Sequence, residues 1–212
     1  CSVRDRLGVV PAATVRRPSC GRRDALARFA RTLAGRLDVP IAESAIAIAG
    51  GVAGNSDRFV AMMNAEARAM GLTNTRFVNP HGLDAPGHYA SVRELVALGR
   101  RAREEYPFIG DVVRRRVARI PGPQGVGTRR LESENDLLSI DRQADGVKTG
   151  HTDGAGYSLV GHATSAPRRM GLYVAIIGEP SRDQRARDAK RLLDWGFRQY
   201  SRVAALPPGG EI

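Results

Sequence analysis

Lysine is almost absent from this chain. It occurs only at Lys148 and Lys190, although the sequence carries 33 lysine and arginine residues and a net charge of +11. The arginines are spread along the whole chain, which is typical of a coding bias towards arginine. Aromatic residues make up 5% of the sequence and do not alternate with a basic run, as a platform for single-stranded nucleic acid requires. We therefore expect no nucleic-acid binding, although the same charge would attract an anionic cell-envelope polymer.

Long apolar runs, metal-ligand clusters and a signal peptide are also missing. No apolar run is long enough to span a membrane, and residues 1–11 lack the continuous apolar segment of a signal peptide. Cys1 and Cys20 have no metal-ligand spacing, and we assign them no role. His81 and His88 are widely separated and poorly supported by carboxylates, so they are expected to stabilise a loop. We expect no transmembrane segment, no metal and no cofactor.

The stretch that organises the chain is DGVKTGHTDGAGYSLV, Asp145–Val160. Its apolar residues and its central Asp-Gly pair predict a strand, a tight turn and a second strand. Side chains alternate along a strand, so Lys148 and Thr149 point to different faces unless they lie on a twisted edge. Gly150 has no side chain and leaves room for another backbone. The stretch therefore predicts a site on a strand edge.

Such a site suits an extended peptide that ends in a carboxylate. The peptide backbone would pair with the strand edge, while the ammonium of Lys148 and the hydroxyl of Thr149 would hold the negative end. A Lys-Thr-Gly tripeptide alone is weak support for this hypothesis, because a lysine beside a tight turn is a common structural feature. The remaining sequence has to decide between the two interpretations.

The other patterns predict an α+β fold. A chain of 212 residues with 42% hydrophobic content is expected to form one domain. Ser91 with Glu94, and Ser181 with Gln184, have the spacing of capping boxes that start helices. The segment 42–53 has the small apolar residues of a tightly packed, buried helix. Helices are also expected at 24–37, at 56–70, from Val92 and after Ser181, and strands at 117–120, 156–163 and 171–177. An antiparallel sheet covered by helices accounts for this order.

From about Ala45 to Leu206 the chain resembles the serine-type D-alanyl-D-alanine carboxypeptidases, the low-molecular-weight penicillin-binding proteins of bacterial cell walls. The resemblance implies a partial β-lactamase/transpeptidase-like domain, which we place at 43–206. Residues 1–42 form an arginine-rich leader that does not share it, and 207–212 form a tail. The stretches that carry the resemblance, in matching order and spacing, are 52–91, the Asn-Asp-Leu-Leu of 135–138, 145–161 and 189–200.

The resemblance implies removal of the terminal D-alanine of peptidoglycan stem peptides through an acyl-serine, which penicillins trap. In this family Ser-x-x-Lys supplies the nucleophile and base, Ser-x-Asn assists proton transfer, and Lys-Thr-Gly binds the substrate carboxylate. The third motif falls on Lys148, Thr149 and Gly150, and His151 is expected to line the same site. The implied partners are the D-Ala-D-Ala end of the stem peptide and β-lactams. The implied location is periplasmic or otherwise extracytoplasmic, although without a signal peptide the chain could be retained in the cytoplasm.

Two of the three motifs do not transfer. Neither lysine has a serine three residues before it, so the sequence contains no Ser-x-x-Lys and we identify no catalytic residue. Ser133-Glu134-Asn135 spells Ser-x-Asn but stands where the family has its Asn-x-Leu-Leu segment, so we interpret it as coincidence. Ser44 and Ser133 are poor substitute nucleophiles, because neither has a lysine nearby in the sequence.

Two explanations for the missing motifs stay open. The chain could be a truncated or frameshifted product whose first 40 residues are read out of frame, which the arginine excess there favours. It could also be a non-catalytic relative that binds peptidoglycan peptides without cutting them. Under either explanation we expect no hydrolysis, since removing the nucleophile of such a catalytic unit costs on the order of a million-fold in rate.

Overall fold

The computed structural model describes residues 10–11, 41–122 and 126–201. The helix expected at 24–37, both cysteines and the tail 207–212 lie outside these residues. The described elements, in chain order, are β1 (Val10–Pro11), α2 (Ile41–Ala53), α3 (Ser56–Ala69), β2 (Thr75–Arg76), β3 (Tyr89–Ala90), α4 (Val92–Glu105), α5 (Pro107–Val113), β4 (Val117–Pro121), β5 (Thr128–Glu132), α6 (Leu137–Ile140), β6 (Ala144–Thr152), β7 (Gly156–Ser165), β8 (Met170–Glu179) and α7 (Arg182–Gln199).

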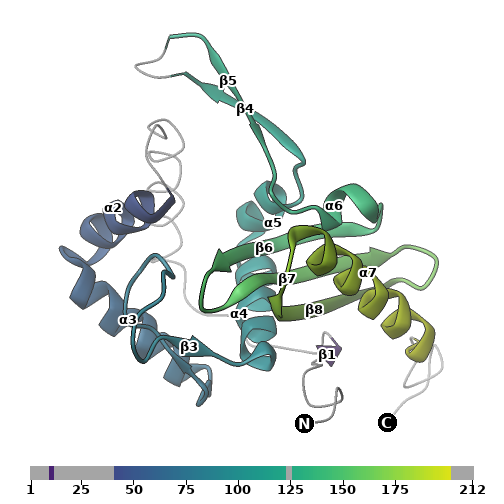
Figure 1. Cartoon of the computed structure of the whole chain (residues 1–212), viewed down its shortest axis with the longest axis horizontal. Coiled ribbons are helices and arrows are strands. Elements are labelled where there is room, and N and C mark those ends of the chain that lie inside the picture. Colours follow the sequence, from purple (N-terminus) through teal and green to yellow (C-terminus); the bar gives the residue numbers. More distant parts are fainter. Residues whose placement is uncertain (1–9, 12–40, 123–125, 202–212) are drawn as a thin grey trace, which may run out of the picture.

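A four-stranded antiparallel sheet in the order β1-β8-β7-β6 forms the centre of the molecule (Figure 1). The predicted strand, turn and strand are confirmed as β6 and β7, which pair from Ala144 opposite Ala163 to Thr152 opposite Gly156. β6 lies at one edge of the sheet, as the sequence predicts. The short β1, which the sequence did not suggest, pairs with β8 at the other edge.

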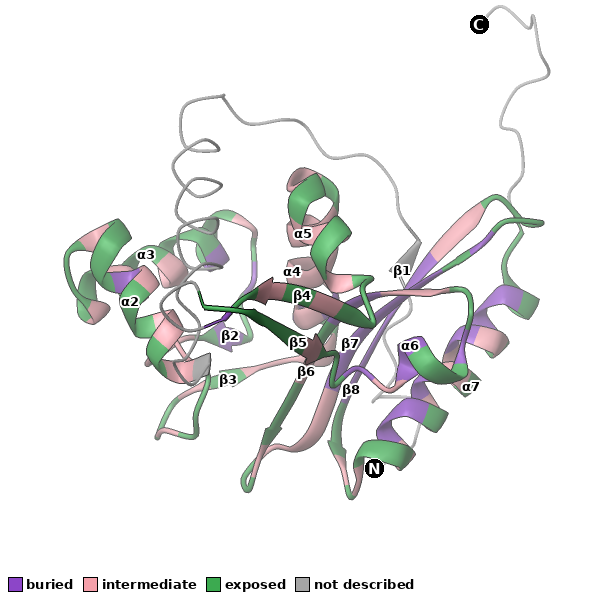
Figure 2. Ribbon diagram, turned by 90° about the horizontal axis from the view of Figure 1, so that it is seen from above, coloured by how far each residue is buried: buried purple, intermediate pink, exposed green. Residues whose placement is uncertain are grey.

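Helices cover both faces of this sheet, with α4 on one face and α7 on the other (Figure 1). This arrangement confirms the predicted α+β fold. Because both faces are covered, β7 and β8 each contain a run of five consecutive buried residues and lack the alternation of a half-exposed strand (Figure 2). The core residues between the sheet and α7 include Leu159, Leu172 and Leu193. Those on the α4 side include Val96, Val147 and Tyr173.

The helix α4 packs unusually close to the sheet at Gly99. A Cβ added at this position would lie 2.6 Å from Cγ1 of Val160 in β7. Such a separation is shorter than van der Waals contact, so a larger side chain would push the helix away from the strands. The glycine therefore fixes the distance between α4 and the sheet.

A polar network links α4 to the sheet next to this contact. The Asp145 carboxylate pairs with Arg103 (Nη2 to Oδ2, 2.7 Å) and contacts Nδ1 of His162. Thr164 Oγ1 donates a third hydrogen bond to Asp145 (3.2 Å). Burial alone would raise the pKa of Asp145, but the hydrogen bond from His162 and the charge of Arg103 outweigh it and lower that pKa. The ionised carboxylate is thus part of the fold.

The predicted helix starts are confirmed, with one difference. Asn55, Ser91 and Ser181 accept hydrogen bonds from the backbone N–H three residues ahead, at the starts of α3, α4 and α7. In a complete capping box the Glu94 side chain would accept a hydrogen bond from Ser91 N. Here Ser91 N donates to the carbonyl of Asn74 instead (3.1 Å). The carboxylate of Glu94 instead accepts from Asn74 N (2.9 Å) and so anchors the segment before β2.

The prediction of a buried helix at 42–53 is right about the helix and wrong about its burial. α2 occupies Ile41–Ala53, but Ala49 is the residue of α2 that is fully buried, while Ile46 and Val52 are 45% and 38% exposed (Figure 2). The reason is packing: among the described elements, α2 packs chiefly on α3. Small apolar residues permit close packing, but they cannot supply the partner that buries them.

The strand expected at 117–120 is confirmed as β4, which pairs with β5 in a hairpin that projects from the body of the molecule (Figure 1). Pro107–Val113 forms the short helix α5, with Pro107 at its first position. In the described part of the chain, every helix is too short or too polar to cross a bilayer.

Candidate functional site

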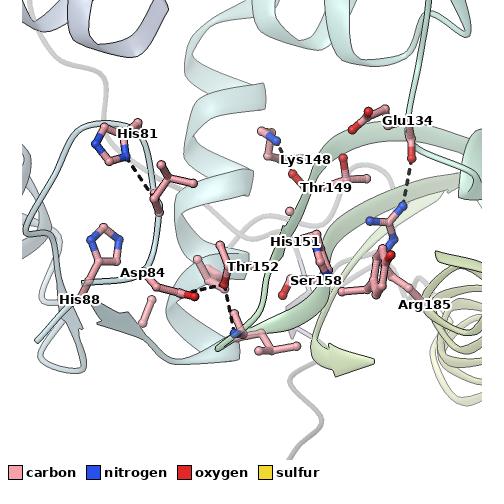
Figure 3. Close-up of a pocket in the computed structure, with 18 of the residues that line it drawn as sticks. His81, Asp84, His88, Glu134, Lys148, Thr149, His151, Thr152, Ser158 and Arg185 are labelled. Atoms are coloured by element: carbon pink, nitrogen blue, oxygen red, sulfur yellow. Dashed lines mark hydrogen bonds between the residues drawn. The ribbon is translucent and has the colours of Figure 1, made fainter. Parts of the chain in front are cut away.

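A cavity of about 680 Å³ lies between the exposed end of β6–β7 and the loop that precedes α4 (Figure 3). We call it the main cavity. Its strand wall is formed by residues 148–158, with Arg182 and Arg185 of α7 and Glu134 beside them. Its loop wall is formed by residues 81–90. Residues of the strand wall in the lining are Lys148, Thr149, Gly150, His151, Thr152, Ala155, Tyr157 and Ser158.

All four residues that the sequence singled out line this cavity. Lys148 and Thr149 are neighbours on β6, yet both reach the cavity because it wraps around the edge of the strand. Beside Gly150 the space is open: a Cβ added there would have only the Cβ of Ser158 within 4 Å, at 4.0 Å. An extended backbone could lie along β6 at this point, as the sequence predicts.

Lys148 is exposed at the edge of β6, although neighbouring protein atoms displace part of the water around its ammonium. Loss of water around the ammonium lowers its pKa, the nearby Arg185 lowers it further, and the carboxylate of Glu134 acts in the opposite direction. Lys148 Nζ contacts the carbonyl oxygen of Thr149. A second negative charge beside this ammonium would favour its charged form.

Arg185 is a functional candidate that the sequence reasoning missed. Its side chain is 4% exposed, although it lines the cavity. Its Nη2 donates to the Glu134 carbonyl (3.0 Å) and lies 3.4 Å from the carboxylate of Asp136, and its guanidinium lies over the ring of Tyr157 at 5.8 Å. Burial lowers its pKa from that of a free arginine, and Asp136 opposes this shift. The cavity thus contains a second, rigidly held cation.

Two further contacts shape this cationic end. Arg182 makes a bidentate contact with Asp136, with Nε and Nη2 each 3.1 Å from a carboxylate oxygen. His151 and Tyr157, which are opposite each other across β6 and β7, stack with their ring centroids 4.0 Å apart. Tyr157 therefore lies between the imidazole of His151 and the guanidinium of Arg185, and it orders both sides of the strand wall.

The loop wall is fastened to the strand wall by Asp84. Thr152 Oγ1 donates to Asp84 Oδ1 (2.7 Å), as Figure 3 shows, and Gly154 N donates to Asp84 Oδ2 (2.9 Å). These two hydrogen bonds lower the pKa of Asp84. Within the loop, His81 Nδ1 accepts from Leu83 N and His88 Nδ1 accepts from Val78 N, both at 3.3 Å. Both histidines bond to loop backbone, in agreement with the role expected for them.

The two serines considered as substitute nucleophiles do not line the main cavity. Ser133 Oγ accepts from Asn135 N (3.2 Å), and Ser44 Oγ is buried. The serine in the described lining is Ser158, whose Oγ bonds to the Gly156 carbonyl (3.4 Å). In the described ranges, His, Cys, Asp and Glu side chains do not gather in threes as a metal ion would need.

The missed arginine had a signal in the sequence. Arg185 falls on the same helical stripe as Ala189 and Leu193, which pack against the sheet. An arginine on an apolar stripe has to find a polar partner, because a buried guanidinium without one is costly. The stripe alone could not show that the partners are the Glu134 carbonyl and Asp136, since they come from a distant segment.

Comparison with known proteins shows which family this chain resembles. The D-alanyl-D-alanine carboxypeptidase family matches residues 41–180. The D-alanyl-D-alanine carboxypeptidase DacA of Escherichia coli is 36% identical over 170 residues, which cover 80% of this chain and 40% of that protein. The chain therefore spans about two fifths of the length of this curated relative.

Solved structures agree. Penicillin binding protein 5 of Haemophilus influenzae superposes with a TM-score of 0.67 at 33% identity and covers 74% of this chain and 44% of that one. The D-alanyl-D-alanine carboxypeptidase of Mycobacterium tuberculosis superposes with a TM-score of 0.63 at 29% identity and covers 77% and 62% of the two chains. The β6–β7 edge, the cavity beside it and these likenesses lead to one assignment. This chain belongs to the D-alanyl-D-alanine carboxypeptidase family.

Proposed function

We propose that the chain binds peptides that end in D-Ala-D-Ala, as the peptidoglycan stem peptide does, along the free edge of β6. The observation that carries the proposal is the position of Lys148 and Thr149 on an edge strand, in the same cavity as the buried Arg185. An edge strand offers unpaired backbone groups to an extended peptide, and two cations at one end suit its terminal carboxylate.

The strand wall suits this task because its parts are fixed before a ligand arrives. β6 is paired to β7 along its length, Arg185 is held by Glu134 and Asp136, and Tyr157 stacks on His151. A preorganised site loses less conformational entropy on binding than a mobile one. The open space beside Gly150 leaves room for the ligand backbone.

Binding, and not hydrolysis, is the activity we propose for these residues. The relatives named above are carboxypeptidases, and acyl transfer in such enzymes needs an activated serine. The sequence has no serine three residues before either lysine, and neither Ser44 nor Ser133 lines the cavity. In the alternative proposal the chain is a hydrolase of the family type. It would act outside the cytoplasmic membrane, where stem peptides and β-lactams reach it.

The chain's two lysines provide a matched test. Binding of an acetylated tripeptide ending in D-Ala-D-Ala is measured by calorimetry, with the same peptide as a C-terminal amide for comparison. We expect Lys148→Ala to weaken binding of the acid by about tenfold or more, because a charge-assisted hydrogen bond is lost. Lys190→Ala is the control, since Lys190 pairs with Asp194 on α7 (2.9 Å) and does not line the cavity.

Equal affinity for the acid and the amide, or no effect of Lys148→Ala, would disprove carboxylate recognition. The hydrolase alternative has its own readout, which is the intact mass of the folded chain after incubation with benzylpenicillin. A covalent adduct would establish a working nucleophile and replace the binding proposal with the catalytic one.

A further inference from the structure

A second cavity, of about 450 Å³, opens beside the β2–β3 pair. It lies between the last turn of α3 and β2, and we call it the side cavity. Its described lining contains two arginines, Arg68 and Arg76, and no acidic side chain. The other lining residues are Asn64, Gly71, Leu72, Thr73, Thr75 and Tyr89.

The charges of the two arginines are not neutralised by the described part of the chain. Arg68 and Arg76 are exposed, and their guanidinium groups form no ion pair or hydrogen bond there. Of the nearby acids, Glu66 pairs with Arg101 (2.5 Å), and the buried Glu94 accepts hydrogen bonds from Asn74 N (2.9 Å) and from the hydroxyl of the lining residue Thr75. A concave surface with two unpaired cations and no acid attracts an anion.

The side cavity adjoins the main cavity through Tyr89, which lines both and is 53% exposed. In the β2–β3 pair Arg76 stands opposite Tyr89. The guanidinium of Arg76 also lies against the loop wall, since a Cβ added at Gly87 would be 3.7 Å from Arg76 Nη1. Tyr89, at the end of the loop wall, therefore belongs to the walls of both cavities.

The direction of the proposed ligand leads from one cavity to the other. A peptide with its terminal carboxylate at Lys148 would run along β6 towards Thr152, because the lining of the main cavity continues in that direction. There Asp84 of the loop wall meets the strand wall through Thr152 Oγ1 (2.7 Å). Upstream residues of such a peptide would then lie beside the loop wall, whose residue Tyr89 also lines the side cavity.

We infer that the side cavity is an anion subsite that receives a carboxylate carried by the bound peptide upstream of its D-Ala-D-Ala end. The inference rests on the proposed function. The substrate class becomes narrower: the chain selects acidic peptides, with the terminal carboxylate at Lys148 and Arg185 and a second carboxylate at Arg68 and Arg76.

A double-mutant cycle between peptide and protein tests the inference. Two acetylated peptides of equal length end in D-Ala-D-Ala and differ by one upstream residue, Glu in one and Gln in the other. Each is titrated into the unmodified chain and into Arg68→Gln/Arg76→Gln. We expect the Glu peptide to bind about three- to tenfold more tightly to the unmodified chain, and this preference to vanish in the double variant, as for partly exposed charge pairs.

Arg58→Gln is the matched control, because Arg58 lies on the same helix, α3, and lines neither cavity. It should keep the full preference for the Glu peptide. The exposed side chains at both substituted positions allow the double variant to fold, and circular dichroism confirms that before titration.

The outcomes separate the two proposals. If both peptides bind equally to the unmodified chain and Lys148→Ala still weakens the binding of both, the subsite is disproved and the proposed function stands. If neither peptide binds, the proposed function fails and the subsite with it. If inorganic phosphate binds at the two arginines while the peptides bind alike, the side cavity takes free anions and the inference is overturned.

Discussion

The strand wall and the loop wall of the main cavity differ in how much buried structure supports them. The strand wall continues into a sheet that is covered by α4 and α7, with Leu159, Leu172 and Leu193 in its core. The loop wall ends in β3, which pairs with the two-residue β2 beside α3, and its described bonds to the strand wall are those of Asp84. The strand wall is therefore held by more buried packing than the loop wall.

Truncating the core behind the strand wall should have the largest effect. Leu193 is 1% exposed and packs between α7 and the sheet. We expect Leu193→Ala to lower the free energy of unfolding by about 3 kcal/mol, because it leaves a cavity. Ile46→Ala on the exposed face of α2 is the control and should cost less than about 1 kcal/mol. Urea unfolding of both variants measures the contrast, and equal losses would refute it.

Breaking the polar network between α4 and β6 should have the second-largest effect on stability. Asp145→Asn removes a carboxylate that pairs with Arg103 at 2.7 Å while 22% of its side chain is exposed. We expect a loss of about 2 kcal/mol at neutral pH, which is less than for a fully buried pair.

The pH dependence of that loss follows from the pKa. The folded-state pKa of Asp145 is lowered relative to the unfolded chain, so its stabilisation is present above about pH 4 and is lost as the pH falls through the folded-state pKa. The difference between Asp145→Asn and the unmodified chain should therefore shrink in acid. Urea midpoints measured between pH 7 and pH 3 test this, and a difference that grows in acid would contradict it.

Loosening the loop wall should have the smallest global effect. Asp84→Asn keeps the size of the side chain but removes the charge and one of the two acceptors for Thr152 and Gly154. We expect the unfolding midpoint to stay almost unchanged, while amide exchange in residues 81–90 accelerates by about three- to tenfold. Hydrogen exchange with peptide-level resolution detects this. Faster exchange throughout β6–β8 would show that the walls are not independent.

Sequence reasoning succeeded where a local pattern decides the structure. The strands β6 to β8 and the starts of α4 and α7 follow from apolar periodicity and from the capping residues Ser91 and Ser181. The position of β6 at a sheet edge also agrees with the prediction from Lys-Thr-Gly. The strand periodicity and the helix caps depend on neighbours within a few residues, which the sequence displays directly.

The rest depends on contacts between distant segments. Burial of α2 was predicted wrongly. Apolar residues such as Ile46 can pack against another element, but the sequence of the helix does not show whether such an element is present. Arg185 escaped notice because its partners, Glu134 and Asp136, are brought to it by the packing of α7 on the sheet. The side cavity joins α3, β2 and Tyr89, which no single motif connects.

The bond between Asp84 and Gly154 joins residues 70 positions apart in the chain. A ligand held by both walls would join the same two segments. Because it would bind the native state and not the unfolded chain, its binding would add to the stability of the native state. Thermal melting then becomes an assay for ligands: at a free concentration of 100 times its dissociation constant, a peptide should stabilise the fold by about 2.7 kcal/mol. A compound that touches the strand wall alone would raise the melting temperature without slowing exchange in the loop wall, which sorts partial ligands from complete ones.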